Sequence, residues 1–429
     1  MTFLRSVPVL IALVALTASA QAQDFKVYGQ MRERTELDAR FLNNAVPMDV
    51  FHLFRTRLGL NARLNDRVSI TAEFQDSRTF GEERTRTGAM TTQNGSAPAF
   101  DMRQGFIEVG GIADGAVTLR LGRTLLPYAN ERFMGLNDWG NFGQSFDAGR
   151  FRYAKDDVML DVFGAALMRN ANSTLAPNYT RDVYLLGTWF QWKPTTTTSQ
   201  LHAFYLYDNP ATSVSAQYRH TAGIHANGSY SGLDYELDAA YQFGSVTRAA
   251  GAPVEDVSIA ANMIGVRVGY TLKDAWNLRL AAGIDRLSGN DPNDATTYGA
   301  FSTLYGTKHR YLGFMDYFTD IPTQTMGLGI QDIVVQFSFV PEDTDIKFAG
   351  DFHIFSTVVD PLEIASIKAA NPEASTGIGQ EFDLTVTWKM FDKLGMTAGY
   401  SIFNGDDERV LLAGKKTTTW GYLMTTLNF

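Results

Sequence analysis

The chain has 429 residues, a formal net charge of −9, 19% charged and 12% aromatic residues, and no cysteine. Because cysteine is absent, a disulfide framework, a thiolate metal site and an acylated lipoprotein anchor are all excluded. No run of about 18 apolar residues follows the first 22, which excludes a helical membrane protein. The negative charge and the lack of a basic run give no support for nucleic acid as a partner.

The first 22 residues have the features of a secretory signal peptide, so the mature domain is expected to be 23–429. Arg5 supplies the charged region, residues 7–16 the apolar region, and residues 20–22 a small-residue cleavage site. A retained anchor is disfavoured, because about ten apolar residues are too few for a helix that needs about 20 to span a bilayer. Cleavage would remove Arg5 and change the net charge from −9 to −10. No Pro-rich or low-complexity linker divides the rest, so a single domain is predicted.

Short and long connections alternate along the mature chain. The tight turns lie at residues 65–66, 154–156, 227–230 and 341–344. The long polar connections lie at residues 37–50, 77–99, 125–145, 245–255, 287–329, 357–377 and 405–416. Bacterial outer-membrane barrels have this arrangement, with short periplasmic turns and longer extracellular loops. The pattern therefore predicts a barrel in the outer membrane.

The predicted strands alternate apolar with polar residues over about ten positions, as expected when one side chain faces lipid and the next faces a lumen. In residues 233–243 an apolar face alternates with a mainly acidic one. Residues 54–64 repeat the pattern with a basic polar face, and residues 382–390 repeat it with a mixed one. A soluble sandwich also alternates, but it does not need such consistent faces over so many long strands.

Eighteen such segments predict an all-β fold, a transmembrane antiparallel β-barrel of about 18 strands. They begin near Phe25, His52, Arg67, Phe100, Val117, Phe146, Asp157, Arg181, Ser199, Gln217, Ser231, Val257, Trp276, Ile330, Asp345, Ile378, Leu394 and Thr418. An even number lets the first strand pair with the last, which removes sheet edges that lipid cannot satisfy. The final strand sets Leu423, Leu427 and Phe429 on one face and resembles the terminal strand recognised by the barrel-assembly machinery. That machinery and membrane lipid are therefore expected partners.

A barrel of about 16 to 18 strands leaves an aqueous channel, so the inward residues decide what it conducts. Rings of arginine favour anions, and the guanidinium fork matches carboxylates. The predicted pore-lining and anion-binding residues are Arg55, Arg57, Arg63, Arg120, Arg123, Arg132, Arg150, Arg152, Arg267 and Arg279. Lys26, Arg32 and Arg34 share the inward face, whereas inward acids such as Asp238 and Asp383 lie in later strands. The alternative is that these arginines only pair with neighbouring acids across the wall.

Two segments carry a family resemblance. Residues 120–153 and residues 301–318 resemble the alginate export family of outer-membrane porins. The departures are small: Thr124 stands where the family's Gly-Arg-Gln has glutamine, and Gly306 stands where it has proline before threonine. The resemblance implies an 18-stranded barrel and, from the family's named member, secretion of an anionic polyuronate through an arginine-rich pore. Many relatives occur in bacteria not thought to make alginate, so the substrate does not carry over with the fold.

For each of two long connections the sequence leaves two arrangements open. In residues 125–145, glycines permit turns that would fold the segment into the mouth, where Arg132 and Arg123 would meet the solute. The alternative is an external loop that shields the rim. Residues 287–329 form the longest connection, and its aromatic cluster is too apolar for a solvated loop, so it should pack on the lumen wall or on a neighbour. That cluster consists of Tyr305, Tyr311, Phe314, Tyr317 and Phe318.

No sequence pattern indicates an enzyme. G-x-S-x-G, H-E-x-x-H and Walker motifs are absent, and the six histidines are scattered. No catalytic residue, cofactor or metal site is expected, although Asp316 and Asp320 could hold Ca²⁺ with backbone carbonyls. The sequence favours an outer-membrane channel for the diffusion or export of small or polymeric anionic solutes, with uronate saccharides such as alginate among them. The alternatives are a general unselective porin and a structural or adhesive barrel with a closed lumen.

Overall fold

The structure, a computed structural model, describes residues 24–43, 45–80, 99–168, 182–210, 215–248 and 256–429. The predicted signal peptide at residues 1–22 lies outside these ranges, as do residues 81–98 and 249–255 of two predicted long connections. No helix in the described ranges is long and apolar enough to cross a membrane.

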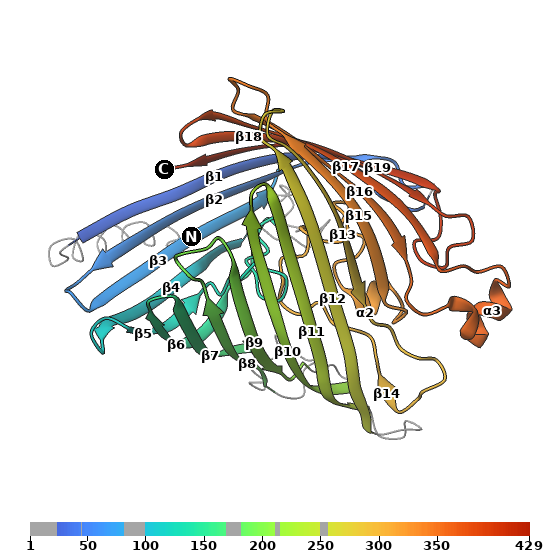
Figure 1. The fold of residues 1–429 in the computed structure, drawn as a ribbon, viewed down its shortest axis with the longest axis horizontal. Helices are drawn as coiled ribbons and strands as arrows, with labels where there is room; N and C mark the ends of the chain where they lie inside the picture. Colours follow the sequence, from blue (N-terminus) through green and yellow to red (C-terminus); the bar gives the residue numbers. More distant parts are fainter. Residues whose placement is uncertain (1–23, 44, 81–98, 169–181, 211–214, 249–255) are drawn as a thin grey trace, which may run out of the picture.

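Eighteen long antiparallel strands of the described chain form one closed sheet (Figure 1). These wall strands are β1 (Asp24–Ala39), β2 (Asp49–Arg63), β3 (Val68–Thr79), β4 (Ala99–Ile112), β5 (Val117–Thr124), β6 (Phe146–Lys155), β7 (Val158–Met168), β8 (Val183–Trp192), β9 (Gln200–Asp208), β10 (Ser215–Tyr230), β11 (Leu233–Arg248), β12 (Asp256–Leu272), β13 (Leu278–Leu287), β15 (Ile330–Phe339), β16 (Ile346–Ser356), β17 (Gly377–Phe391), β18 (Leu394–Gly405) and β19 (Thr417–Asn428). The two-residue strand β14 (Thr297–Tyr298) lies in a loop and pairs parallel with β12. The short helices are α2 (Ile321–Gln324), the 3-10 helix η2 (Pro361–Glu363) and α3 (Ala365–Ala370).

The sheet closes because the first wall strand pairs with the last. β1 is hydrogen-bonded to β2 on one side and to β19 on the other, so that Arg34 lies opposite both Leu53 and Met424. The backbone of Phe429 extends this seam by exchanging two hydrogen bonds with Gly29, of 2.9 and 3.0 Å. No wall strand in the described ranges keeps an unpaired edge, which hydrocarbon could not satisfy. The predicted transmembrane β-barrel of about 18 strands is confirmed.

The alternation of the sequence sets which side chains face out of the barrel and which face in. On β11, Leu233, Tyr235 and Tyr241 are 45, 40 and 49% exposed on the outer surface, whereas Asp238 is 1% exposed in the interior. Phe429 at the end of the last strand is also on the outer surface and is 47% exposed. The outer surface therefore presents apolar and aromatic side chains, and the charged ones are collected inside.

Short turns join the strands at one end of the barrel, the short-turn end, and longer loops join them at the other, the long-loop end. Two of the described long loops turn back into the interior. We name them L3 (residues 125–145, between β5 and β6) and L7 (residues 288–329, between β13 and β15). L3 is hydrogen-bonded to inward side chains of β1 and β2, and L7 to inward side chains of β17.

An apolar core fills part of the interior between these loops and the wall. Leu126 and Met134 of L3 and Phe301 of L7 are at most 1% exposed. They belong to one cluster with wall residues such as Trp189 and Phe355. The interior is therefore only partly available to water.

The aromatic cluster of residues 287–329 joins this core. The ring of Phe318 lies 5.0 Å from that of Phe355 on β16, and the ring of Tyr317 lies 5.3 Å from that of Phe403 on β18. Of the two locations expected for the cluster, the lumen wall is the one that it occupies in the structure.

Val335 and Gln336 test the facing assignment because they are neighbours in the middle of β15. Val335 is 54% exposed on the outer surface, whereas Gln336 faces the interior and donates a 3.0 Å hydrogen bond to Asp351. Val335→Arg is expected to destabilise the folded barrel by about 2 to 4 kcal/mol, the cost of arginine near the bilayer midplane, whereas Gln336→Arg should be tolerated. The measurement is urea unfolding in lipid vesicles, followed by tryptophan fluorescence. Equal destabilisation by the two variants would contradict the assignment.

Candidate functional site

A cluster of arginine side chains from the first strands projects into the interior. It consists of Arg32 and Arg34 on β1, Arg55 and Arg57 on β2, and Arg103 on β4. The antiparallel register sets Arg32 directly opposite Arg55, so the guanidinium groups gather at one level of the wall. We call these five residues the arginine cluster, and their exposures lie between 2 and 7%.

Backbone carbonyls of L3 are the main partners of the arginine cluster. Arg32 donates to three consecutive carbonyl oxygens, those of residues 138–140, at 2.7, 3.2 and 3.2 Å. Arg55 donates to the first and third of them, both at 3.1 Å, and Arg34 donates to the second at 2.8 Å. Hydrogen bonds from a charged donor are stronger than those between neutral groups. These contacts hold L3 against β1 and β2.

The carboxylate of Asp138 adds ionic contacts to the same loop. Arg57 donates to both of its oxygens at 3.0 and 2.8 Å, and Arg103 donates to one at 2.8 Å. Burial raises the pKa of Asp138, but the hydrogen bond from Arg57 and the charges of Arg55, Arg57 and Arg103 outweigh it and lower the pKa from 3.8 to about 2. Asp138 is therefore ionised at physiological pH.

The arginine cluster carries more positive charge than nearby carboxylates neutralise. Among the described residues, Asp138 and Glu73 are the carboxylates within 4.0 Å of the β2 and β4 members of the cluster, and Arg34 on β1 forms a 2.6 Å salt bridge with Glu36. Three carboxylates of the described chain thus face five guanidinium groups. Arg32 has no carboxylate oxygen within that distance in the described chain, and its hydrogen bonds go to L3 carbonyls and to the side-chain amide of Asn141. Carbonyl dipoles solvate a charge without cancelling it. A net positive field therefore remains at this level of the lumen.

L3 and L7 contact each other inside the barrel. The indole of Trp139 stacks on the imidazole of His309 from L7, with ring centroids 3.8 Å apart. The backbone amide of Tyr305 donates to a carbonyl of L3 at 3.1 Å. Arg132 of L3 forms a buried 2.8 Å salt bridge with Asp285 near the end of β13. The two loops thus form one packed unit across the lumen.

L7 is held on an acid-bearing part of the wall by its backbone N–H groups. The amides of Phe314 and Met315 donate to the carboxylates of Asp383 and Glu381 on β17, at 3.2 and 2.8 Å. Gly313 precedes them with a φ of +84°, and a Cβ atom there would lie 2.5 Å from Oε1 of Glu381. Only glycine both adopts this positive φ readily and leaves room for the Glu381 carboxylate.

Three predicted pore-lining arginines on β5 and β6 face the interior but are paired with acids. Arg120 forms a 2.6 Å salt bridge with Glu108, and Arg152 forms a 2.7 Å salt bridge with Asp161. Arg150 lies between the same two acids, at 3.8 and 3.9 Å. For these three residues the structure agrees with the alternative stated in the sequence analysis, in which inward arginines pair with neighbouring acids of the wall.

Three further predicted arginines lie at other places in the wall. Arg267 and Arg279 each form a 2.6 Å salt bridge with a lumen aspartate, Asp285 and Asp234 respectively. Arg63 lies at the short-turn end of β2, half exposed and 3.5 Å from an aspartate of the adjoining turn. The inward arginines therefore occupy several separate sites and do not form one ring.

Arg123 does not face the interior, and its predicted place on the pore lining is corrected. It shares the outer face of β5 with Leu119 and Leu121, which are 42 and 71% exposed, because positions two apart in a strand lie on one side. Its salt bridges of 3.2 and 3.3 Å join it to Asp147 and Asp101. The prediction placed both Arg120 and Arg123 on the pore lining, although positions three apart in a strand such as β5 (Val117–Thr124) lie on opposite faces.

Sequence reasoning missed Arg103, Asp138 and Arg310. Arg103 reaches the lumen at a β-bulge, where the register with β3 shifts between Glu73 and Phe74, and a strict alternation does not reveal it. Asp138 and Arg310 act from loops whose path depends on distant partners. The contact of Asp138 with the arginine cluster, for example, joins residues 81 positions apart.

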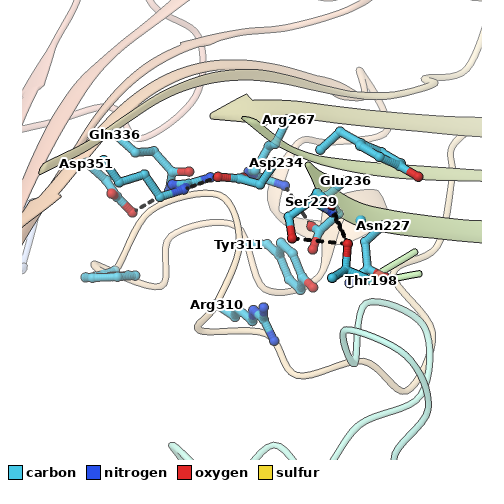
Figure 2. A pocket seen from close by; sticks show the side chains of 14 residues that line it. Thr198, Asn227, Ser229, Asp234, Glu236, Arg267, Arg310, Tyr311, Gln336 and Asp351 are labelled. Atoms are coloured by element: carbon cyan, nitrogen blue, oxygen red, sulfur yellow. Dashed lines mark hydrogen bonds and ion pairs between the residues drawn. The ribbon is translucent and has the colours of Figure 1, made fainter. Parts of the chain in front are cut away.

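A cavity of about 520 Å³ remains between L7 and the wall (Figure 2). Arg310 and Tyr311 of L7 line one side of it. Asp234, Glu236 and Arg267 on β11 and β12 line the facing side. The lining is mostly polar, so this part of the interior is suited to water and hydrophilic solutes.

Comparison with known proteins identifies the family. Residues 22–407 match the family model described as alginate export. The chain belongs to this family. No curated protein matches it significantly in sequence. Its family and its barrel fold place it in the outer membrane as a porin channel, with the short-turn end on the periplasmic side.

Solved outer-membrane proteins share the fold of this alginate export family member. OccAB1 of Acinetobacter baumannii aligns with a TM-score of 0.61 at 12% identity, over 95% of this chain and 98% of that one. OccK9 (OpdG) of Pseudomonas aeruginosa aligns with a TM-score of 0.60 at 12% identity, over 95% and 99%. OpdK of Pseudomonas aeruginosa, solved with vanillate, aligns with a TM-score of 0.58 at 9% identity, over 95% and 99%. At these identities the similarity concerns the fold alone.

The two acids considered for Ca²⁺ make other contacts. Asp316 lies 3.0 Å from Nδ1 of His309, and Asp320 accepts a 2.8 Å hydrogen bond from Thr323. In the described ranges, no group of three or more His, Asp or Glu side chains is placed to hold a metal ion.

Gly313→Ala tests whether L7 limits conduction through the porin. The added methyl group would collide with Glu381, and the φ of +84° disfavours alanine, so L7 should leave β17. We expect a several-fold rise in single-channel conductance in planar bilayers. Gly115→Ala is the matched control, because Gly115 has a φ of +89° in a periplasmic turn but open space around its Cβ. Equal effects of the two substitutions would mean that backbone strain alone changes the channel.

The contacts of Asp138 should survive mild acid. Because its pKa in the folded protein is lowered to about 2 from 3.8, its stabilisation is fully present above a pH of about 4 and is lost as the pH falls through about 2. We expect constant conductance between about pH 8 and pH 5, and an increase only near pH 2. Asp138→Asn should show that increase already at neutral pH. A wild-type transition between about pH 5 and pH 7 that Asp138→Asn abolishes would contradict this prediction.

Proposed function

We propose that this porin selects anionic solutes and that L3 and L7 narrow its lumen. The observation that carries the proposal is the arginine cluster, whose positive charge exceeds that of the carboxylates around it. A positive field inside a narrow lumen bounded by low-dielectric walls concentrates anions and repels cations. Membership of the alginate export family suggests uronate-type saccharides among these anions.

The lumen arginines divide into two groups with different roles in this proposal. The arginine cluster, including Arg55 and Arg57, supplies the field that selects the solute. Arg120, Arg150 and Arg152 are close to acids and contribute mainly to the stability of the wall. Arg132, Arg267 and Arg279 also form salt bridges, and they too contribute mainly to stability.

The fold is compatible with a carboxylate solute. OpdK, whose barrel aligns with 95% of this chain, was solved with vanillate, which is a carboxylate. Diffusion or export of an acidic saccharide would use the same positive field, since the field acts on charge and does not depend on direction.

We also propose how the chain reaches the membrane. Residues 1–22 would direct secretion and be removed, leaving residues 23–429 as the barrel. Phe429, which is 47% exposed on the outer surface of the folded barrel, would present the last strand to the barrel-assembly machinery.

Arg32→Gln combined with Arg55→Gln tests the anion selectivity. Removing two charges from the arginine cluster should shift the reversal potential under a KCl gradient towards cations. The shift should shrink at high salt, because screening acts over about 8 Å at physiological ionic strength and over shorter distances above it. Arg123→Gln is the matched control, since Arg123 lies on the outer face and is paired with Asp101 and Asp147.

The alternatives give different recordings. Conductance with unchanged selectivity in the double variant would favour a general unselective porin. Absence of conductance in the wild type and in Gly313→Ala would favour a structural barrel with a closed lumen.

A further inference from the structure

The cavity in Figure 2 lies on the periplasmic side of the loops. Thr198, Asn227 and Ser229, which line it, are close to the turns of the short-turn end, and Arg310 and Tyr311 of L7 line its other side. Its volume of about 520 Å³ falls within the range of roughly 300 to 1,000 Å³ found for small-molecule sites. A solute that enters from the periplasm would therefore meet this cavity before it passes L7.

The acids of the cavity are already engaged by neighbouring side chains. The pairs are Asp234 with Arg279 at 2.6 Å, Glu236 with Arg267 at 3.8 Å, and Asp351 with Gln336 at 3.0 Å. Their carboxylates are therefore poorly placed to bind an additional cation.

Arg310 differs from the other arginines of the cavity. Its side chain is exposed to the cavity, and no carboxylate in the described ranges lies within 4.0 Å of it. One of its nitrogens, Nη1, donates a 3.1 Å hydrogen bond to the backbone carbonyl of Asn130. A guanidinium has five N–H donors in a fork that fits a carboxylate, so donors remain for a bound anion.

The rest of the lining is suited to a hydroxylated molecule. Asn227, Ser229 and Gln336 provide amide and hydroxyl groups, which can hydrogen-bond to hydroxyl groups of a ligand. Phe314 also lines the cavity, and its partly exposed side chain offers an apolar surface for the C–H face of a ring. A small acid with several hydroxyl groups matches both features.

We propose that this cavity is a binding site for small hydroxylated carboxylates, in which Arg310 binds the carboxylate. The proposal deepens the proposed function, since it names a ligand class and places its first binding site on the periplasmic side. Arg310 is carried by L7 and also binds L3 through Asn130. An occupied site would therefore contact the junction of the two loops that narrow the lumen.

Equilibrium binding to the full-length protein in detergent tests the site directly. Galacturonate is the probe, and galactose, which has the same ring with a hydroxymethyl group in place of the carboxylate, is the neutral control. Isothermal titration calorimetry should show binding of galacturonate and not of galactose. Arg310→Gln should weaken galacturonate binding at least tenfold, and Arg310→Lys should weaken it less because the charge remains. Lys308→Gln is the matched control, since Lys308 is on the same loop but lines a different cavity.

Planar bilayer recordings test the side of entry. The chain has no cysteine, so Asp66→Cys introduces a single thiol in a periplasmic turn. A membrane-impermeant thiol reagent reacts with it only from that side and so shows the orientation of the channel. Galacturonate should reduce conductance when added to the periplasmic side and should do so less in Arg310→Gln. Equal binding of galactose, or unchanged galacturonate binding in Arg310→Gln, would overturn the proposal. A block of conductance only when galacturonate is added to the extracellular side would also overturn the proposal.

The two proposals fail in distinguishable ways. If galacturonate binding depends on Arg310 but the channel shows no anion selectivity, the proposed function fails and the site stands. If the channel selects anions but galacturonate binding does not depend on Arg310, the site fails and the proposed function stands.

Discussion

A backbone that crosses hydrocarbon must satisfy every N–H and C=O group within the protein, and the rest of this structure depends on that constraint. Pairing of β1 with β19 meets it by closing the sheet. In a closed sheet each strand has one lipid face and one lumen face, so the polar half of every alternating segment is directed inward. The lumen therefore contains many charged side chains, and the loops L3 and L7 occupy part of the same space.

The two inner loops solvate these charges with opposite ends of the peptide group. L3 offers carbonyl oxygens of residues 138–140 to the arginine cluster, and L7 offers the amides of Phe314 and Met315 to acids of β17. Each loop thus replaces water around buried ionisable side chains, whose burial without hydrogen bonds would destabilise the barrel. Backbone groups of the loops therefore dock on polar side chains of the wall, in addition to the side-chain contacts of Asp138 and Arg132.

This division explains what the sequence could and could not predict. The strands, their number and the inward face of Asp238 follow from a period of two residues, which is a local property. The sequence left an inward and an external position of L3 open, and the structure places L3 inside. Arg123 was assigned to the wrong face because the alternation that directs Arg120 inward was not carried on to position 123. Arg103 depends on a β-bulge, and the docking of L3 on the arginine cluster depends on contacts between distant residues. Neither leaves a periodic signal in the chain.

The partners of an arginine decide what it contributes to the channel. Where a carboxylate lies close by, as for Arg152 and Asp161 at 2.7 Å, the two charges largely cancel at a distance and the pair acts on the stability of the wall. Where carbonyl oxygens are the partners, as for Arg32, they replace part of the lost hydration of the guanidinium and leave its charge without a neighbouring negative charge. L3 therefore does more than narrow the passage. Because L3 supplies several carbonyls and the single carboxylate of Asp138, the buried arginines keep a net positive charge beside the loop. In the proposed function, selectivity and constriction would then arise from the same contacts.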